Sequence, residues 1–176
     1  MYFRALITAA TASTAIALAL TGCSAGTNGT GTDPAATSAS TASATPGPQL
    51  GQPFEVKQND GTAKITIESA TYGTSLGGVL DTPAKNGGYL ILDVLWETST
   101  GTSSPNPLYV KAKDASGHEG TIAIGVDNAL ASGDVPVGDK ARGNVAFDIG
   151  AGPYTIVVTD QLFQEKARLT AVATAR

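Results

Sequence analysis

Apolar and polar residues alternate with a period of two over most of the chain beyond residue 50, a pattern typical of antiparallel β-strands. Phe54 and Val56 alternate with charged residues, and Ile65 and Ile67 resume the alternation after an Asn-Asp-Gly sequence at 59–61. Because that tripeptide favours a tight turn, we expect the two runs to pair as a β-hairpin.

The strongest strand signal covers residues 89–96, which are apolar on both faces except for Asp93. A strand that is buried on both faces lies in the centre of its sheet. We expect Asp93 to face solvent, to pair with a basic side chain or to belong to a site, and we favour a structural role. Further apolar runs predict strands at 108–113, 121–124, 141–149, 154–159 and 167–172. Good helix formers at 164–168 leave the last of these open between strand and helix.

These runs, with no alternation of strands and helices, predict an all-β fold for residues 50–176. The expected architecture is an immunoglobulin-like antiparallel β-sandwich of about seven to nine strands, with a small closed barrel as the alternative. The chain contains one cysteine, which excludes an intramolecular disulfide. The packed core alone must therefore stabilise the domain.

Residues 1–22 have the pattern of an export signal, because a short basic start precedes an uncharged segment at 5–20. That segment is shorter than the roughly 20 apolar residues that span a bilayer. The sequence Leu-Thr-Gly-Cys at 20–23 resembles the lipobox of bacterial lipoproteins. The resemblance implies cleavage between Gly22 and Cys23, a diacylglyceryl group on the Cys23 sulfur, and anchoring in the lipid of the cell membrane on its extracytoplasmic side. The alternatives are a permanent membrane helix and an ordinary secretory signal with an incidental cysteine.

After the cysteine, the segment 23–49 consists almost entirely of Ser, Thr, Ala, Gly, Pro and Asn. Such a segment cannot bury enough apolar surface to fold, so we predict a disordered tether between Cys23 and the folded domain. The composition fits a glycosylated stalk as well as a bare one.

Several short motifs of the folded part occur in an order that is similar to an immunoglobulin-like domain of Gram-positive bacterial lipoproteins. The motifs lie at 50–56, 89–96, 113–117, 136–139 and 143–147. That family is related in fold to the secreted mycobacterial immunoprotective antigen. The resemblance covers about residues 50–173 and implies the fold, but it implies no catalytic residue, because its motifs are structural.

The chain carries a formal net charge of −4, with 15% charged residues, so we expect no nucleic-acid partner. His118 is the sole histidine and follows the turn-forming residues 114–117, where a solvated role is far more common than a catalytic one. Too few soft ligands are present for a transition metal, and the acidic residues lack the spacing of a calcium loop. The acidic residues of the predicted loops are Asp81, Asp114, Glu119, Asp127, Asp134 and Asp139. We therefore expect no cofactor, no metal and no enzyme activity.

The segment 73–88 is long for a connection in a sandwich and carries Leu76, Val79 and Leu80 between glycines. Long loops inside compact domains are often functional, so these three residues form a candidate interaction loop. The alternative is that the segment folds back as an extra hairpin and buries its apolar side chains.

The leading functional hypothesis is a lipid-anchored, non-enzymatic binding module for a protein or glycan of the cell envelope. One alternative is an envelope enzyme or enzyme accessory, which a cleft containing Asp93, His118 or Glu119 with a nucleophile would favour. Another is a sandwich that binds a small ligand between its sheets, which would require an internal apolar cavity.

Overall fold

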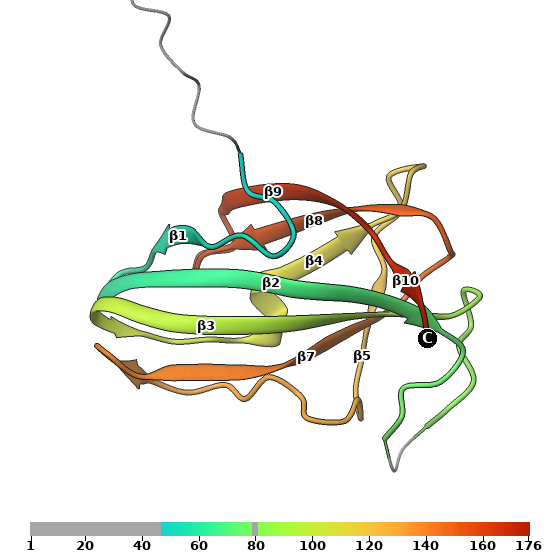
Figure 1. The fold of residues 1–176 in the computed structure, drawn as a ribbon, viewed down its shortest axis with the longest axis horizontal. Helices are drawn as coiled ribbons and strands as arrows, with labels where there is room; N and C mark the ends of the chain where they lie inside the picture. Colours follow the sequence, from blue (N-terminus) through green and yellow to red (C-terminus); the bar gives the residue numbers. More distant parts are fainter. Residues whose placement is uncertain (1–46, 79–80) are drawn as a thin grey trace, which may run out of the picture. The chain divides into compact units, whose positions relative to one another are not determined.

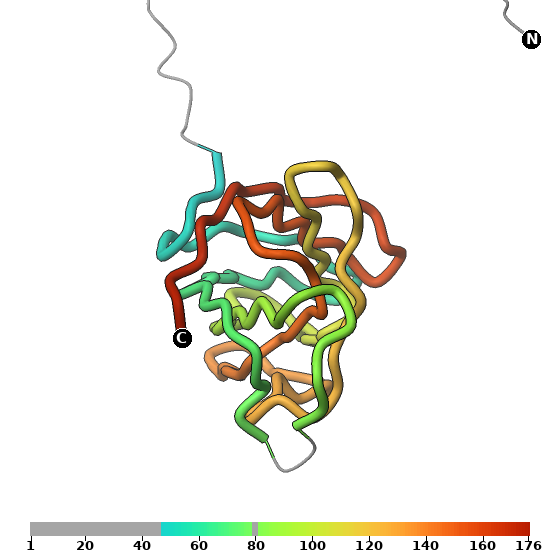
Figure 2. The backbone as a smooth tube through the Cα atoms, turned by 90° about the vertical axis from the view of Figure 1, so that its right-hand side faces the viewer, coloured from blue at the N-terminus to red at the C-terminus, as the bar shows by residue number. Residues whose placement is uncertain are grey.

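The structure is a computed structural model that describes residues 47–78 and 81–176. The predicted signal peptide, Cys23, most of the predicted tether, Val79 and Leu80 lie outside the described residues. The described chain forms a two-layer β-sandwich, whose strands run across the view in Figure 1 and are seen from the end in Figure 2.

Ten strands and one short 3-10 helix, η1, make up the described fold. Their bounds are β1 (Phe54–Lys57), β2 (Gly61–Gly73), β3 (Tyr89–Ser103), η1 (Pro107–Tyr109), β4 (Val110–Lys113), β5 (Thr121–Ala123), β6 (Val135–Pro136), β7 (Lys140–Asp148), β8 (Pro153–Thr159), β9 (Glu165–Val172) and β10 (Thr174–Ala175).

The larger sheet has the strand order β1-β2-β3-β7-β5, with β10 paired to β2 and β6 paired to β3, and the smaller sheet has the order β4-β8-β9. The predicted hairpin is confirmed, since β1 pairs antiparallel with β2 and places Val56 opposite Ala63. The predicted central strand is also confirmed, because β3 lies between β2 and β7. The predicted all-β sandwich is therefore confirmed. Its one parallel pair among the described strands is β10 with β2.

The main core lies between the two sheets. Trp96 on β3, Phe147 on β7 and Tyr154 on β8 are its largest side chains, and each is almost completely buried. Alternation along β9 turns Ala167 and Leu169 inward, with charged or polar neighbours outward. The open choice at the end of the chain is therefore settled as a strand, because burial of this stripe outweighs the helix propensity of 164–168.

The far end of β3 is fixed by a buried chain of polar groups. Trp96 Nε1 donates to Ser103 Oγ at 2.8 Å, and the hydroxyls of Thr98 and Ser103 lie 2.6 Å apart. Thr98 Oγ1 then donates to the carbonyl of Val135 on β6 at 2.8 Å. Each polar side-chain atom of Trp96, Thr98 and Ser103 has a hydrogen-bond partner, which is the condition for burying these groups without loss of stability.

Candidate functional site

Gly73 ends β2, and the described residues that follow it, 74–78 and 81–88, lie against the outer face of the larger sheet and contain no strand. Leu76 is 1% exposed and packs in a second apolar cluster with Tyr89, Ile91, Val126 and Ala146. This burial corrects the expectation for Leu76, whose side chain is not available to a partner. Because a sheet face rich in Tyr and Ile needs cover, the segment folds back over it.

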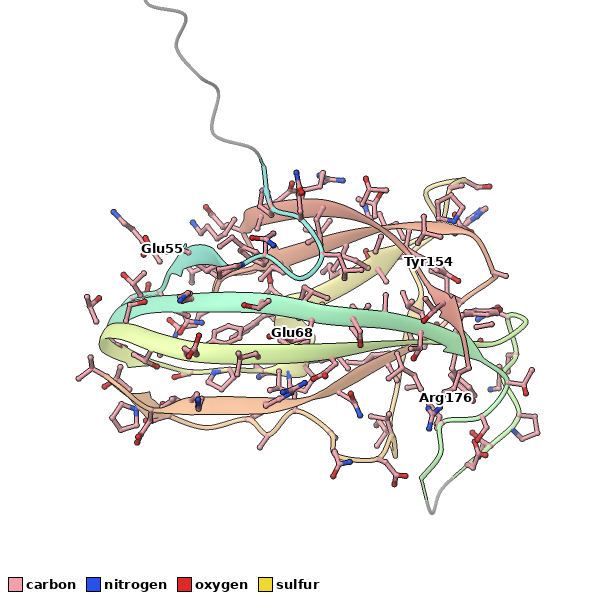
Figure 3. All side chains as sticks on the ribbon, in the orientation of Figure 1. Glu55, Glu68, Tyr154 and Arg176 are labelled. Atoms are coloured by element: carbon pink, nitrogen blue, oxygen red, sulfur yellow. The ribbon has the colours of Figure 1, made fainter. Side chains whose placement is uncertain are left out.

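Two carboxylates hold this segment in place. Asp81 accepts hydrogen bonds from the Ser75 hydroxyl and the Leu76 N–H, and these bonds keep the pKa of Asp81 below its ordinary value. Asp148, at the end of β7, accepts from the N–H groups of Lys85 and Asn86 at 2.8 Å each. Arg176, labelled in Figure 3, adds a hydrogen bond from its guanidinium to the carbonyl of Leu76. The segment is thus a fixed cover.

His118 lies on the exposed turn where it was predicted, with a side chain that is 83% exposed. Its Nδ1 lies 3.3 Å from Asp114 Oδ2. Asp114 also accepts from the N–H groups of Ser116 and His118, so this carboxylate organises the turn. The predicted solvated role of His118 agrees with this geometry.

A polar cleft of about 420 Å³ brings His118 close to Glu119 and Asp148. Glu119 forms an ion pair with Lys111 at 3.3 Å, and both oxygens of Asp148 bind backbone N–H groups. Asp93 lies elsewhere, where its carboxylate accepts from Arg142 Nε at 3.1 Å and from Nη2 at 2.6 Å. The cleft thus brings together His118 and Glu119 but not Asp93, which has the paired structural role that was favoured.

The acidic residues of the loops have separate local roles. Ser104 Oγ donates to Asp134 at 2.7 Å, Asp114 organises its own turn, and Asp81 holds the segment that follows β2. Within 47–78 and 81–176, no group of three or more His, Cys, Asp or Glu side chains is placed to hold a metal ion.

The edge of the larger sheet at β5 is the clearest binding feature of the described surface. Strand β5 pairs with β7 and, in the described part of the chain, with no other strand, so it forms the edge of its sheet. An edge strand presents unpaired N–H and C=O groups, and proteins commonly protect such edges with charged residues. The sequence Thr-Ile-Ala-Ile at 121–124 contains no charge, and Ile124 is 84% exposed.

An apolar pocket of about 140 Å³ lies directly beside this edge. Ile122, Ile124 and Val126 line it from the strand and the chain that follows, and Pro107 and Val145 line it from the neighbouring segments. A volume of this size accommodates one aliphatic or aromatic side chain, since an engineered apolar cavity of roughly 150 Å³ binds benzene. The edge and the pocket together can accept an extended chain and one of its apolar side chains.

Acidic residues flank the edge at both ends, and the one before β5, Glu119, is paired with Lys111. Glu119 precedes β5 by two residues and Asp127 follows Ile124 by three. The pocket itself is lined mainly by apolar side chains, with Asn144 as its polar member. A partner segment with a basic residue beside an apolar one would complement this arrangement.

The sequence predicted a strand at 121–124 but gave no means of placing it at an edge. The sequence analysis also did not single out Leu162 and Phe163, two large exposed residues in the turn between β8 and β9. One signal was present, because a turn between strands seldom carries two adjacent large apolar residues.

No protein-family model matches the chain, and no curated protein matches it. Among solved structures, the secreted protein MPT63 of Mycobacterium tuberculosis superposes with a TM-score of 0.56 and 14% identity, over 73% of this chain and 98% of that one. A candidate lipoprotein of Bacillus subtilis, ycdA, superposes with a TM-score of 0.54 and 13% identity. That match covers 69% of this chain and 39% of ycdA, so this chain spans about two fifths of that protein's length.

These two structures show a shared fold, and they confirm the predicted relation in fold to the secreted mycobacterial antigen. In the described part of the chain, no helix is long and apolar enough to cross a membrane.

Proposed function

We propose that this protein is an extracytoplasmic lipoprotein, anchored through an acylated Cys23, whose domain is a non-enzymatic binding module. The lipobox-like sequence at 20–23 supports the anchor. The domain's fold is shared with a candidate lipoprotein and with a secreted protein, which supports a location outside the cytoplasm. The binding surface is the β5 edge together with its apolar pocket.

The uncharged edge at 121–124, exposed at Thr121 and Ile124, is the observation that carries the binding role. An extended segment of a partner protein adds to β5 as a further strand, and main-chain hydrogen bonds supply affinity. One apolar side chain of the segment enters the pocket beside Ile124 and supplies specificity. A basic residue nearby meets the charge of Asp127.

A protein partner is favoured over a glycan. The free groups of a strand edge are peptide N–H and C=O, spaced to match another extended chain rather than a sugar ring. An acidic domain that repels phosphate backbones also disfavours nucleic acid.

Photo-crosslinking in intact cells tests this role. A benzophenone amino acid replaces Ile124 in one variant and Val172, which is 71% exposed on the opposite sheet, in a matched control. We expect a discrete protein adduct from position 124 that is absent from position 172. Identical adduct patterns from the two positions would exclude the edge as a binding site.

Fractionation tests the anchor separately. Cys23→Ala removes the acylated sulfur, so we expect the protein to leave the membrane fraction or to remain unprocessed, since an acyl-anchored protein depends on its buried methylenes for membrane retention. Unchanged fractionation of the variant would contradict lipidation and would leave the crosslinking result standing.

A further inference from the structure

The turn between β8 and β9 carries a second apolar feature, distinct from the β5 edge. Leu162 is 67% exposed and Phe163 is 57% exposed, and Leu108 of η1, on the neighbouring segment, is 52% exposed. The ring of Phe163 contacts Tyr109 of η1 edge-on, with centroids 5.9 Å apart. We call the group Leu108, Leu162 and Phe163 the apolar tip.

The apolar tip is held rigidly although it is exposed. Asp160 Oδ1 accepts from the N–H groups of Leu162 and Gln164 at 2.9 Å each, and Asp160 Oδ2 lies 2.9 Å from Lys166 Nζ. Thr159 Oγ1 donates to the carbonyl of Tyr109, which joins the turn to η1. A turn fixed in this way presents its side chains without further ordering on binding.

Phe163 has a φ of +58°, a left-handed backbone conformation that bulky residues rarely adopt. Glycine or asparagine would fit this position at lower conformational cost. A strained backbone at an exposed aromatic residue points to a role for that side chain outside the fold.

Basic side chains lie beside Phe163 of the apolar tip. Lys111, Lys113 and Arg168 line a shallow hollow with Phe163, and Lys166 lies in the next strand position after Glu165. Together these four basic residues exceed the nearby acids Glu119, Asp160 and Glu165 by one charge, although the whole chain carries −4. Lys111, Lys166 and Arg168 form surface ion pairs with Glu119, Asp160 and Glu165, and surface pairs of this kind contribute little stability, so that lipid phosphates can compete for the cations. Exposed apolar residues beside lysine and arginine match the surface of an anionic bilayer, where the apolar side chains enter the interface and the cations meet lipid headgroups.

The chain between Cys23 and Gly47 is long enough to allow this contact. These 23 intervening residues can reach at most roughly 75–85 Å when fully extended. A domain of this size has a radius of gyration of about 14 Å, so any face of it can reach the bilayer that holds the anchor. Tethering supplies a local concentration in the millimolar range, at which even a weak interfacial contact is occupied.

We propose that the apolar tip docks the domain onto the anionic membrane surface, so that the lipoprotein lies on the bilayer. The inference uses the anchor of the proposed function, but the contact itself does not require acylation. A segment of a partner protein is the competing occupant, and it is less favoured because the hollow beside Phe163 is lined mainly by charged residues and offers little apolar surface to a peptide side chain.

Vesicle flotation at about 10 mM lipid, in the millimolar range that tethering supplies, tests the proposal with the mature chain, residues 23–176, carrying Cys23→Ser so that no acyl group contributes. The probes are vesicles of phosphatidylcholine alone and of phosphatidylcholine with 40% phosphatidylglycerol. We expect binding to the anionic vesicles and a loss of at least about tenfold in the double variant Leu162→Ser/Phe163→Asn, because two partly buried apolar side chains are removed. Val137→Ser, at an equally exposed turn residue, is the control and should bind as the parent chain does.

Equal binding of the double variant and the parent chain would overturn the proposal, and so would absence of binding to anionic vesicles. Either result leaves the crosslink from position 124 and the fractionation of Cys23→Ala unaffected, so failure of this inference is distinguishable from failure of the proposed function. Unchanged thermal midpoints for the double variant confirm that a loss of binding does not reflect unfolding.

Discussion

Trp96 donates its indole N–H to Ser103 Oγ at 2.8 Å in a site where both residues are completely buried. The two residues belong to the same strand, and their bond crosses the irregular end of β3, where the strand leaves β7 and pairs with β6. The bond therefore ties the largest core side chain to the end of β3 that pairs with β6.

Ser103→Ala should remove the acceptor and leave the Trp96 N–H buried without a partner. We expect a loss of about 1–3 kcal/mol in the free energy of unfolding, the usual cost of an orphaned buried donor. Urea denaturation followed by the fluorescence of the single tryptophan measures it. Thr102→Ala, at the adjacent half-buried position, is the control, and an equal loss in both variants would contradict this account.

Leu76→Ala should destabilise the cover over the second cluster. Leu76 is almost completely buried, and Leu-to-Ala changes at such sites cost about 2–5 kcal/mol, with the lower end expected here because a coil segment can relax into the cavity. Ile124→Ala, at an exposed site, should change the free energy of unfolding by no more than about 0.5 kcal/mol. The reverse ranking in denaturation experiments would contradict the burial assigned to the two residues.

The stability of the β8–β9 turn should depend on pH through Asp160. The hydrogen bond from Lys166, followed by bonds from backbone N–H groups, keeps the pKa of Asp160 below its ordinary value. A lowered pKa in the folded state means that the charged carboxylate stabilises the fold above its ordinary pKa, and that this contribution is lost as the pH falls through the folded pKa.

Asp160→Asn should therefore be less stable than the parent chain at neutral pH, and the difference should shrink as the pH falls below about 4. Thermal unfolding of both proteins between pH 7 and 2.5 measures the difference. A stability difference that stays constant over this range would show that the charge of Asp160 contributes nothing.

Phe163→Asn should leave the free energy of unfolding within about 0.5 kcal/mol of the parent value. The lost edge contact with Tyr109 costs about 0.5–1 kcal/mol, and relief of the left-handed backbone returns a similar amount. Tyr109→Ala loses the same contact without that relief, so it should be clearly less stable in thermal denaturation. A large loss in Phe163→Asn alone would show that the turn serves the fold rather than a partner.

The hydrophobic pattern predicted the sandwich because burial on one face of each strand leaves a period of two in the sequence, as in β7 with Val145 and Phe147. It also predicted β3 as the central strand. The pattern could not predict the burial of a single leucine within a connection between strands. Leu76 has the same composition signal whether it covers a sheet or extends from a loop, and only the three-dimensional position of Tyr89 and Ile91 decides between them.

The candidate site was less predictable than the fold. Thr121 to Ala123 is identifiable as a strand, but edge position depends on the order of strands in the sheet, which a single sequence does not contain. The role of Asp93 depends on the register of β3 and β7. Asp93 lies opposite Asn144, and Arg142, two residues from Asn144 on the same face, pairs with the Asp93 carboxylate.

Mapped crosslinks test most directly whether a partner chain adds to β5 as a strand, which is the central part of the proposed function. Thr121→Cys and Ala123→Cys place single labels two residues apart on one face of β5. Cys23 is the one cysteine of the chain, and the proposed acylation would block its thiol. A thiol-linked benzophenone at each position, followed by peptide mapping, locates the partner residues. The account predicts contacts two residues apart in one extended partner segment, whereas unrelated contacts, or contacts three to four residues apart on a helix, would contradict it.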